Sequence, residues 1–324
     1  NISSLRQVTT AVVAADAHLF DPVDPVRGLD QSVAINYFLK RPAQKVALEI
    51  VDTRGQVVRT FSSADTAGTG GRGGGGAGGA GGDDDDDEGS GRRGGGPPRV
   101  SNRAGVNRFT WDLRHPGPTT FPNMILWAAG SNGPRAIPGD YSVRLRVDER
   151  APLTQTFAIL LDPRAPHVTV ADLQTQFELA MQVRARTSEA NEAVIRIRNV
   201  KTQIDDRMSK ANIKARDAAL QLKEKLSRVE EELYQVRNQS SQDPLNYPIK
   251  LNNKLAALLG AVEGVEGSPT DQSREVFREL SARLDQQLTW LNTIFTQDVP
   301  RFNNEWIRPN NLQPITVSAA RPIT

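Results

Sequence analysis

The sequence predicts an α+β protein in which an antiparallel β-sandwich of the fibronectin or immunoglobulin type is followed by an antiparallel helical bundle. Two observations lead to this class. Between residues 31 and 162, apolar and polar residues alternate over short runs separated by Gly, Pro and Asp, which is typical of strands in an all-β domain. Between residues 163 and 298, apolar residues recur every three or four positions, which is typical of amphipathic helices.

Six short runs are predicted to be strands, and turn residues separate them. They are Ser32–Leu39, Lys45–Val51, Gln56–Phe61, Gly105–Leu113, Tyr141–Val147 and Thr154–Leu161. The stretch Asp52–Gly55 is predicted to close a hairpin, because Gly55 can adopt a positive φ at little cost. Trp111 is expected to fill the core between the two sheets. The absence of any helical periodicity in this part favours a sandwich.

A regular apolar seam defines the helical part, which is expected to begin at Asp172 as a helix N-cap. The seam steps by three and four residues through Ala219, Leu222, Leu226, Val229, Leu233 and Val236. It needs cover, which apolar stripes at 173–204 and 277–295 are expected to supply in a bundle of three or four helices. Glu230, with Glu231 and Glu232, is expected on a solvated helix face.

Both ends of the chain are predicted to be irregular. Residues 1–30 contain Asp-Pro breakers, and residues 299–324 contain four prolines. The run GRGGGGAGGAGGDDDDDEGSGRR at 71–93 lies inside an insert at 63–101. Its glycines lead into aspartates, which would repel a phosphate, and Asp83–Asp87 lack the spacing of a calcium loop. Loose association with divalent cations stays open, but the composition favours a disordered surface loop of the sandwich.

The composition and the spacing of polar residues argue against several classes of partner and site. Forty basic and 38 acidic residues give a net charge of +2, which argues against nucleic acid as a partner. Cysteine is absent, and no apolar run is long enough for a membrane span. The three histidines, His18, His115 and His167, lack metal-ligand spacing. Asp112, Asp140 and Asp162 lie at strand or turn positions, where aspartate commonly bonds the backbone. We therefore predict no catalytic, cofactor-binding or metal-binding residue.

One loop is a candidate interface because it is apolar and aromatic without being a clear strand. Its sequence is FPNMILW, from Phe121 to Trp127, and Phe121, Met124, Ile125 and Trp127 are the candidate contact residues. Three interpretations are open. The loop folds back on its own sandwich, docks against the helical bundle or another domain, or stacks a sugar on Trp127.

Several stretches together resemble one protein family. NISSLRQVT at the start is similar to the exit from the last blade of sortilin-like β-propeller proteins, large and usually secreted bacterial proteins with sialidase-type BNR repeats. GVNRFTWDLRHPGP, GPRAIPGDYSVRLRV and TQTFAILLDPR resemble their fibronectin-like sandwich, and DLQTQFELAMQVR, YPIKLNNKLAALLG and PTDQSREVFRELSARLDQQL resemble their terminal helical region. The resemblance implies that residues 1–30 link to a propeller outside this chain, and no family catalytic residue has a matching position here.

These observations lead to three hypotheses about function. The first is a non-catalytic accessory or interaction module of a secreted or periplasmic propeller protein, with its own upstream propeller as the partner. The second is the C-terminal part of a sialidase-type glycosyl hydrolase whose active site lies outside this chain. The third is a module that binds a carbohydrate or a peptide, which the fold alone does not establish.

Overall fold

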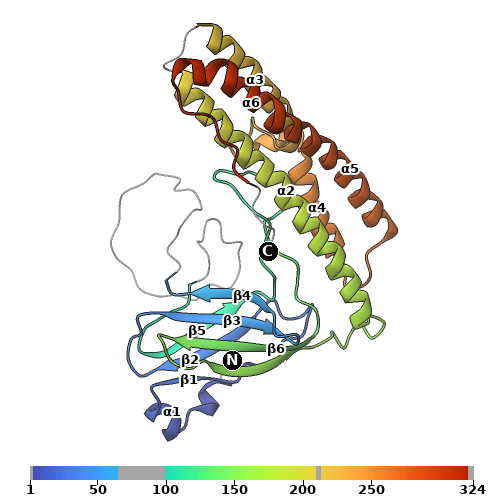
Figure 1. Cartoon of the computed structure of the whole chain (residues 1–324). Coiled ribbons are helices and arrows are strands. Elements are labelled where there is room, and N and C mark those ends of the chain that lie inside the picture. The colour runs from blue at the N-terminus through green and yellow to red at the C-terminus, as the bar shows by residue number, and fades with distance from the viewer. Residues whose placement is uncertain (1–2, 65–98, 209–212, 320–324) are drawn as a thin grey trace. The chain divides into compact units, whose positions relative to one another are not determined.

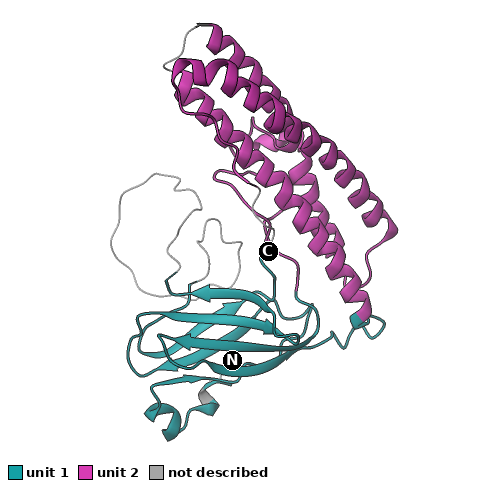
Figure 2. Cartoon of the chain, viewed as in Figure 1, with its two compact units in different colours: residues 1–116, 136–170 teal, residues 117–135, 171–324 magenta. Residues whose placement is uncertain are grey.

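The computed structural model describes residues 3–64, 99–208 and 213–319, with its elements labelled in Figure 1. Two compact units are present (Figure 2): a β unit of residues 1–116 and 136–170, and a helical unit of residues 117–135 and 171–324. The fold is therefore α+β, as predicted. The segment 117–135 connects two strands of the β unit but belongs to the helical unit, so the chain passes between the units three times.

Within the described residues the β unit has seven strands in two antiparallel sheets, with orders β1-β2-β5 and β4-β3-β6-β7. The strands are Ala17–Leu19 (β1), Val33–Leu39 (β2), Val46–Asp52 (β3), Val57–Ser62 (β4), Gly105–Trp111 (β5), Gly139–Val147 (β6) and Leu153–Ile159 (β7). In a constant-type immunoglobulin sandwich the fourth strand lies beside the fifth. Here β4 pairs with β3 instead. Of the two predicted types, the sandwich therefore has the fibronectin-like arrangement.

The core of the β unit lies between the two sheets. The alternate residues of β2 and β6 that begin with Val33 and Tyr141 are buried, and most of their neighbours are partly exposed. Trp111 is fully buried, as predicted, and its Nε1 donates to the carbonyl of Arg114 at 3.0 Å. The hydroxyl of Tyr141 donates to the carbonyl of Ile137 at 3.0 Å. A tyrosine that bonds back from the start of the sixth strand is the tyrosine corner of such sandwiches.

Two predicted boundaries of the β unit were wrong. Residues 1–30 contain β1 and the short helix α1 (Thr10–Ala14), and a three-residue strand is too short to show alternation in the sequence. The predicted insert at 63–101 also ends too late, because Val100 is buried in the core and the carbonyl of Ser101 accepts a hydrogen bond from Tyr37. Residues 65–98, with Asp83–Asp87 and the predicted disorder, lie outside the described residues.

The helical unit contains four long helices within the described residues, and its apolar side chains form a second core. The helices are Val170–Met208 (α2), Ile213–Leu233 (α3), Leu251–Val262 (α4) and Asp271–Thr293 (α5). The expected N-cap at Asp172 was wrong. The helix α2 begins two residues earlier, so Asp172 lies in its first turn, where its Oδ1 accepts from the hydroxyl of Ser268 at 2.7 Å.

The predicted seam is buried within the same chain from Ala219 to Leu233, with Leu226 fully inaccessible, but its last predicted member, Val236, lies beyond the end of α3 and is exposed. Ion pairs give the direction of α3 against α2. Glu230 accepts from Arg198 at 2.7 Å, whereas Lys223, nearer the start of α3, donates to Asp205 at 2.6 Å. The two helices are therefore antiparallel. Glu230 is itself buried, so the solvated face predicted for it was wrong: two cations of α2 pair with it.

The helix α4 runs in the same direction as α3. Near its start Asn252 donates to Asn191 of α2 at 3.1 Å, and near its end Val262 accepts from Gln176 of α2 at 3.0 Å. Since α3 and α4 both run antiparallel to α2, they follow each other along it (Figure 1). The bundle therefore consists of three rods. In chain order they are α2, a middle rod made of α3 and α4 end to end, and a third rod that begins with α5.

The third rod extends beyond the predicted bundle. Helical turns continue from α5 through a π-helical turn at Ile294–Asp298, α6 (Val299–Phe302), a second π-helical turn at Asn303–Ile307 and a 3₁₀ turn at Arg308–Asn310. The irregular tail predicted at 299–324 was therefore wrong up to residue 310. Pro300 reads as a helix breaker, but it lies at the start of α6, where a missing N–H is tolerated. None of the described helices is long and apolar enough to cross a membrane.

Candidate functional site

The segment 117–135 is built into the helical unit through the loop that the sequence marked as a candidate interface. Phe121 is 6% exposed, and its ring meets that of Tyr234 edge-on with 5.0 Å between centroids. The guanidinium of Arg198 lies 4.8 Å from the centroid of the Phe121 ring. Met124 is partly buried against the same core. The apolar residues at the beginning of this loop are thus internal parts of the helical unit.

The main chain of the same loop is held by the side chains of Tyr234, directly after α3, and Asn253 of α4. The hydroxyl of Tyr234 accepts from the N–H of Ile125 at 3.1 Å. Asn253 exchanges two hydrogen bonds with Trp127: its Oδ1 accepts from the N–H at 2.6 Å, and its Nδ2 donates to the carbonyl at 2.9 Å. Asn253 therefore pairs with the loop as the backbone of a neighbouring strand would.

The long helix α2 contributes a third set of contacts. The hydroxyl of Ser188 accepts from the N–H of Thr119 at 3.1 Å, and Nδ2 of Asn191 donates to the carbonyl of Thr119 at 2.7 Å. Asn191 also accepts from Asn252 through its Oδ1. Both Ser188 and Asn191 are buried. Buried polar side chains in the middle of a helix need partners. The hydroxyl of Ser188 donates to the carbonyl of Arg184 in α2 itself, whereas Asn191 finds its partners in the inserted segment and in Asn252.

The position of these contacts explains why the helical unit needs the segment. Tyr234 follows the last residue of α3, and Asn253 is the third residue of α4. Near them in the chain, Glu230 contacts residue 198 of α2 and Asn252 contacts residue 191. These two positions of α2 are ~10 Å apart along the helix. The segment 117–135 therefore packs where the middle rod is interrupted, and it covers polar groups of α2 that a continuous helix would otherwise cover.

Both ends of the segment are fixed locally. Gly117 lies so close to the carbonyl of Ser131 that an added Cβ would be 2.0 Å from the oxygen, so only glycine fits. At the other end, the N–H of Arg135 donates to Glu263 at 2.7 Å and its guanidinium pairs with Glu266 at 2.9 Å. The segment is therefore a closed loop of the helical unit.

The carboxylates considered for acid–base chemistry have structural partners or lie exposed. Asp112 forms an ion pair with Arg59 at 3.1 Å. Hydrogen bonds from the guanidinium and N–H of Arg164 lower the pKa of Asp162 below its ordinary value. Asp140 is exposed at the start of β6. Among the described residues, no group of three or more His, Asp or Glu side chains could hold a metal ion.

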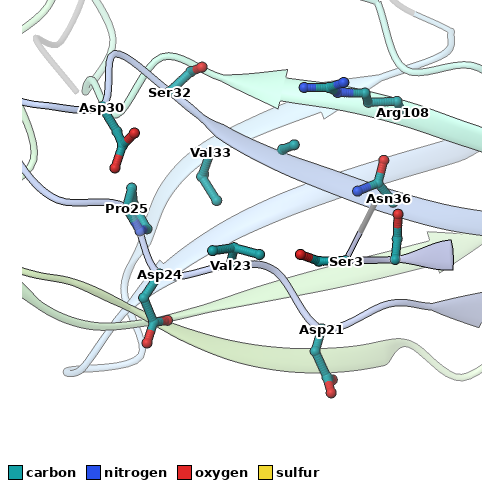
Figure 3. Close-up of a pocket in the computed structure, with 12 residues that line it drawn as sticks. Ser3, Asp21, Val23, Asp24, Pro25, Asp30, Ser32, Val33, Asn36 and Arg108 are labelled. Atoms are coloured by element: carbon teal, nitrogen blue, oxygen red, sulfur yellow. The ribbon is translucent and has the colours of Figure 1, made fainter. Parts of the chain in front are cut away.

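Sequence reasoning missed a polar pocket of 170 Å³ in the β unit (Figure 3). It lies where the chain leaves β1 and passes β2, and its lining includes Asp24, Asp30, Ser32, Asn36 and Arg108. Asn36 and Arg108 are directly opposite each other in the β2–β5 ladder. The breaker Asp21-Pro22 was the available signal, because it ends the pairing of β1 with β2.

Comparisons with known proteins do not assign a family. No protein-family model matches the chain, and neither does any curated protein. Among solved structures, CopC from Methylosinus trichosporium OB3b is similar at 15% identity and a TM-score of 0.20, covering 45% of this chain and 93% of CopC. The β-glucuronidases of Bifidobacterium dentium and Lactobacillus rhamnosus match at 14% and 13% identity, with TM-scores of 0.19 and 0.17. The chain spans only 18% and 16% of their lengths, and such low scores carry no argument.

Proposed function

We propose that this chain is a non-catalytic structural and interaction module of a larger secreted protein built around a sortilin-like β-propeller. The insertion of residues 117–135 into the helical unit is the observation that carries the proposal. Loops between strands are where binding and catalytic residues usually concentrate. In this chain the connection from β5 to β6 is used for internal packing instead.

The same insertion makes the two units interdependent. Residues 171–324 alone would lack the segment that pairs with Tyr234, Asn253 and Asn191. Conversely, the connection from β5 to β6 would lose the contacts that hold it if the rest of the helical unit were absent. A pair of units that cannot be separated at a linker suits a support that holds another domain. The resemblance of the first residues to the exit of a propeller supports a propeller as that domain.

The residues before β1 are the expected contact with the preceding domain. Val13 of α1 is 55% exposed and Val8 is 41% exposed, and both lie where the chain arrives from upstream. Single exposed valines are ordinary on protein surfaces, so a matched control is needed. Val106 on β5 is also 55% exposed and lies far along the chain from α1. Val13→Asp and Val106→Asp therefore add the same charge at equally exposed sites.

The experiment produces the preceding segment of the same gene and this chain as two polypeptides and measures their association by calorimetry. A one-to-one complex is expected, weakened by Val13→Asp and unchanged by Val106→Asp. Absence of a complex would overturn the proposal. A second assay offers aryl glycosides and sialosides to this chain alone. Turnover that Asp112→Asn or Asp140→Asn abolishes would refute the non-catalytic role, whereas turnover by the preceding segment would support the glycosyl hydrolase hypothesis.

A further inference from the structure

The pocket of the β unit forms where the pairing of β1 with β2 ends. The N–H of Phe20 donates to the carbonyl of Asn36 at 3.0 Å, which continues the β1–β2 ladder by one residue. The next ladder position on that side would be occupied by Pro22, which has no N–H to donate. The chain then leaves β2, and the N–H of Leu160 donates to the carbonyl of Pro25 at 2.8 Å beyond β7. A gap remains beside the first half of β2, and this gap is the pocket.

The departure of the chain leaves main-chain groups of β2 at the pocket without a partner among the described residues. In an antiparallel strand, residues two apart direct their N–H and C=O groups to the same side. Since the carbonyl of Asn36 points toward β1, the N–H and C=O of Ala34 point that way too. No backbone hydrogen bond joins Ala34 to the crossing residues 21–25. The pocket therefore offers one donor and one acceptor from the edge of β2.

At least three polar side chains of the lining also have no partner among the described residues. The side chains of Ser32, Asn36 and Arg108 make no hydrogen bond or ion pair with any residue in the described parts of the chain. Asp30 uses its Oδ2 to accept from the N–H of Val26 at 2.7 Å, and its Oδ1 has no such partner among those residues. In Figure 3, Asp30 lies on one side of the pocket and Asn36 and Arg108 on the other, with Val33 between them.

We propose that this pocket binds a compact zwitterion of amino-acid size, with its ammonium group at Asp30 and its carboxylate at Arg108 and Asn36. Asp30 and Arg108 lie on opposite sides of the pocket (Figure 3), so a ligand that carries both charges can pair with both of them. The volume of 170 Å³ is below the ~300 Å³ at which pockets begin to hold drug-sized ligands. Charge-assisted hydrogen bonds are the stronger kind, and the free groups of Ala34 add a neutral donor and acceptor. This inference does not depend on the proposed structural role.

The test measures binding to the full chain by calorimetry and by amide shifts of β2 in NMR spectra. Glycine, alanine and glycylglycine are the zwitterions, and ethanolamine and propionate carry one charge each. Arg108→Gln and Asp30→Asn remove one charge each, and the asparagine keeps an acceptor for Val26. Arg144→Gln is the matched control, since Arg144 is another strand arginine, on β6 of the other sheet, and it has no ion pair with a residue that the structure describes.

At least one zwitterion is expected to bind at least about tenfold more tightly than either single-charge compound, with shifts at Val33–Asn36. Arg108→Gln and Asp30→Asn should each weaken that binding by about tenfold or more, as expected for losing a charged hydrogen bond. Arg144→Gln should leave it unchanged. No shift at β2 with millimolar ligand would overturn the proposal. Equal binding of the single-charge compounds, or binding that Arg108→Gln leaves intact, would overturn it as well.

Discussion

Asn253→Ala tests whether the segment 117–135 is held as an integral part of the helical unit. Asn253 is 4% exposed, and its side-chain amide makes both hydrogen bonds to the main chain of Trp127. Alanine keeps the helix propensity of α4 but removes both bonds. The N–H and carbonyl of Trp127 then lose the only side chain that pairs with them in the described structure. The loop should open locally before the bundle unfolds.

The magnitude follows from the two bonds. A typical intramolecular hydrogen bond contributes a net ~0.5–1.5 kcal/mol, so their joint loss should cost about 1–3 kcal/mol. If that free energy holds the loop closed, the hydrogen-exchange protection of the Trp127 amide should fall by about 5- to 150-fold. The amide of Ile125, which bonds to the hydroxyl of Tyr234, should lose protection with it. Amides in β2 and β6 should keep theirs.

Gln176→Ala is the matched control for this experiment. Gln176 is also a buried amide of the helical unit, and its Nε2 donates to the carbonyls of Val262 at 3.0 Å and Val265 at 2.7 Å. The substitution Gln176→Ala should destabilise the end of α4 and leave the hydrogen-exchange protection of the Trp127 amide unchanged. Equal loss at Trp127 in both variants would refute local anchoring by Asn253. Unchanged protection of Trp127 in Asn253→Ala would refute the reasoning altogether.

Three further predictions concern stability. Leu226→Ala should lower the free energy of unfolding by about 2–5 kcal/mol, with a midpoint independent of protein concentration; a midpoint that moves with concentration would indicate an intermolecular seam. Burial raises the pKa of Tyr141 to about 12, so its folded state keeps the proton longer and stability should fall as pH rises above ~10; Tyr141→Phe should cost about 1 kcal/mol and weaken this alkaline loss in urea titrations. The N–H groups of Gln239 and Ser240 lower the pKa of Asp243, so its contribution is present above the ordinary pKa and lost as pH falls through the lowered one; Asp243→Asn should remove this acid dependence from their NMR shifts.

The sequence predicted those elements in which the periodicity of the apolar residues is regular along the whole element. The strand β6 alternates strictly from Tyr141 to Val147, and α3 has a heptad seam, so each pattern identifies both the element and its buried face. The six predicted strands correspond to β2–β7. The hairpin turn was predictable for the same reason: Gly55 has φ of 77° and its N–H bonds to the carbonyl of Asp52.

Features that depend on a distant partner could not be predicted in this way. Glu230 reads as one of three surface glutamates, and only the approach of Arg198 and Lys201 makes it a buried ion pair. Phe121 and Trp127 marked an interface, but the sequence contains no sign that the helical unit holds the ring of Phe121 and the main chain of Trp127. Asn253 is one of two consecutive asparagines at the start of a helix. Its role appears only when the segment 117–135 is placed beside it.

The break between α3 and α4 explains why the helical unit contains the segment 117–135. A continuous helix opposite α2 would cover its polar middle with its own side chains, and Asn191 would be a poor choice there because its buried amide needs partners. The break between α3 and α4 exposes that stretch of α2, and extended main chain is rich in the donors and acceptors that it needs. Thr119 supplies one of each. The polar residues of α2, the break after α3 and the long connection from β5 to β6 are therefore mutually dependent. A substitution such as Asn191→Leu, which would favour a continuous apolar bundle, should weaken the fold of this chain.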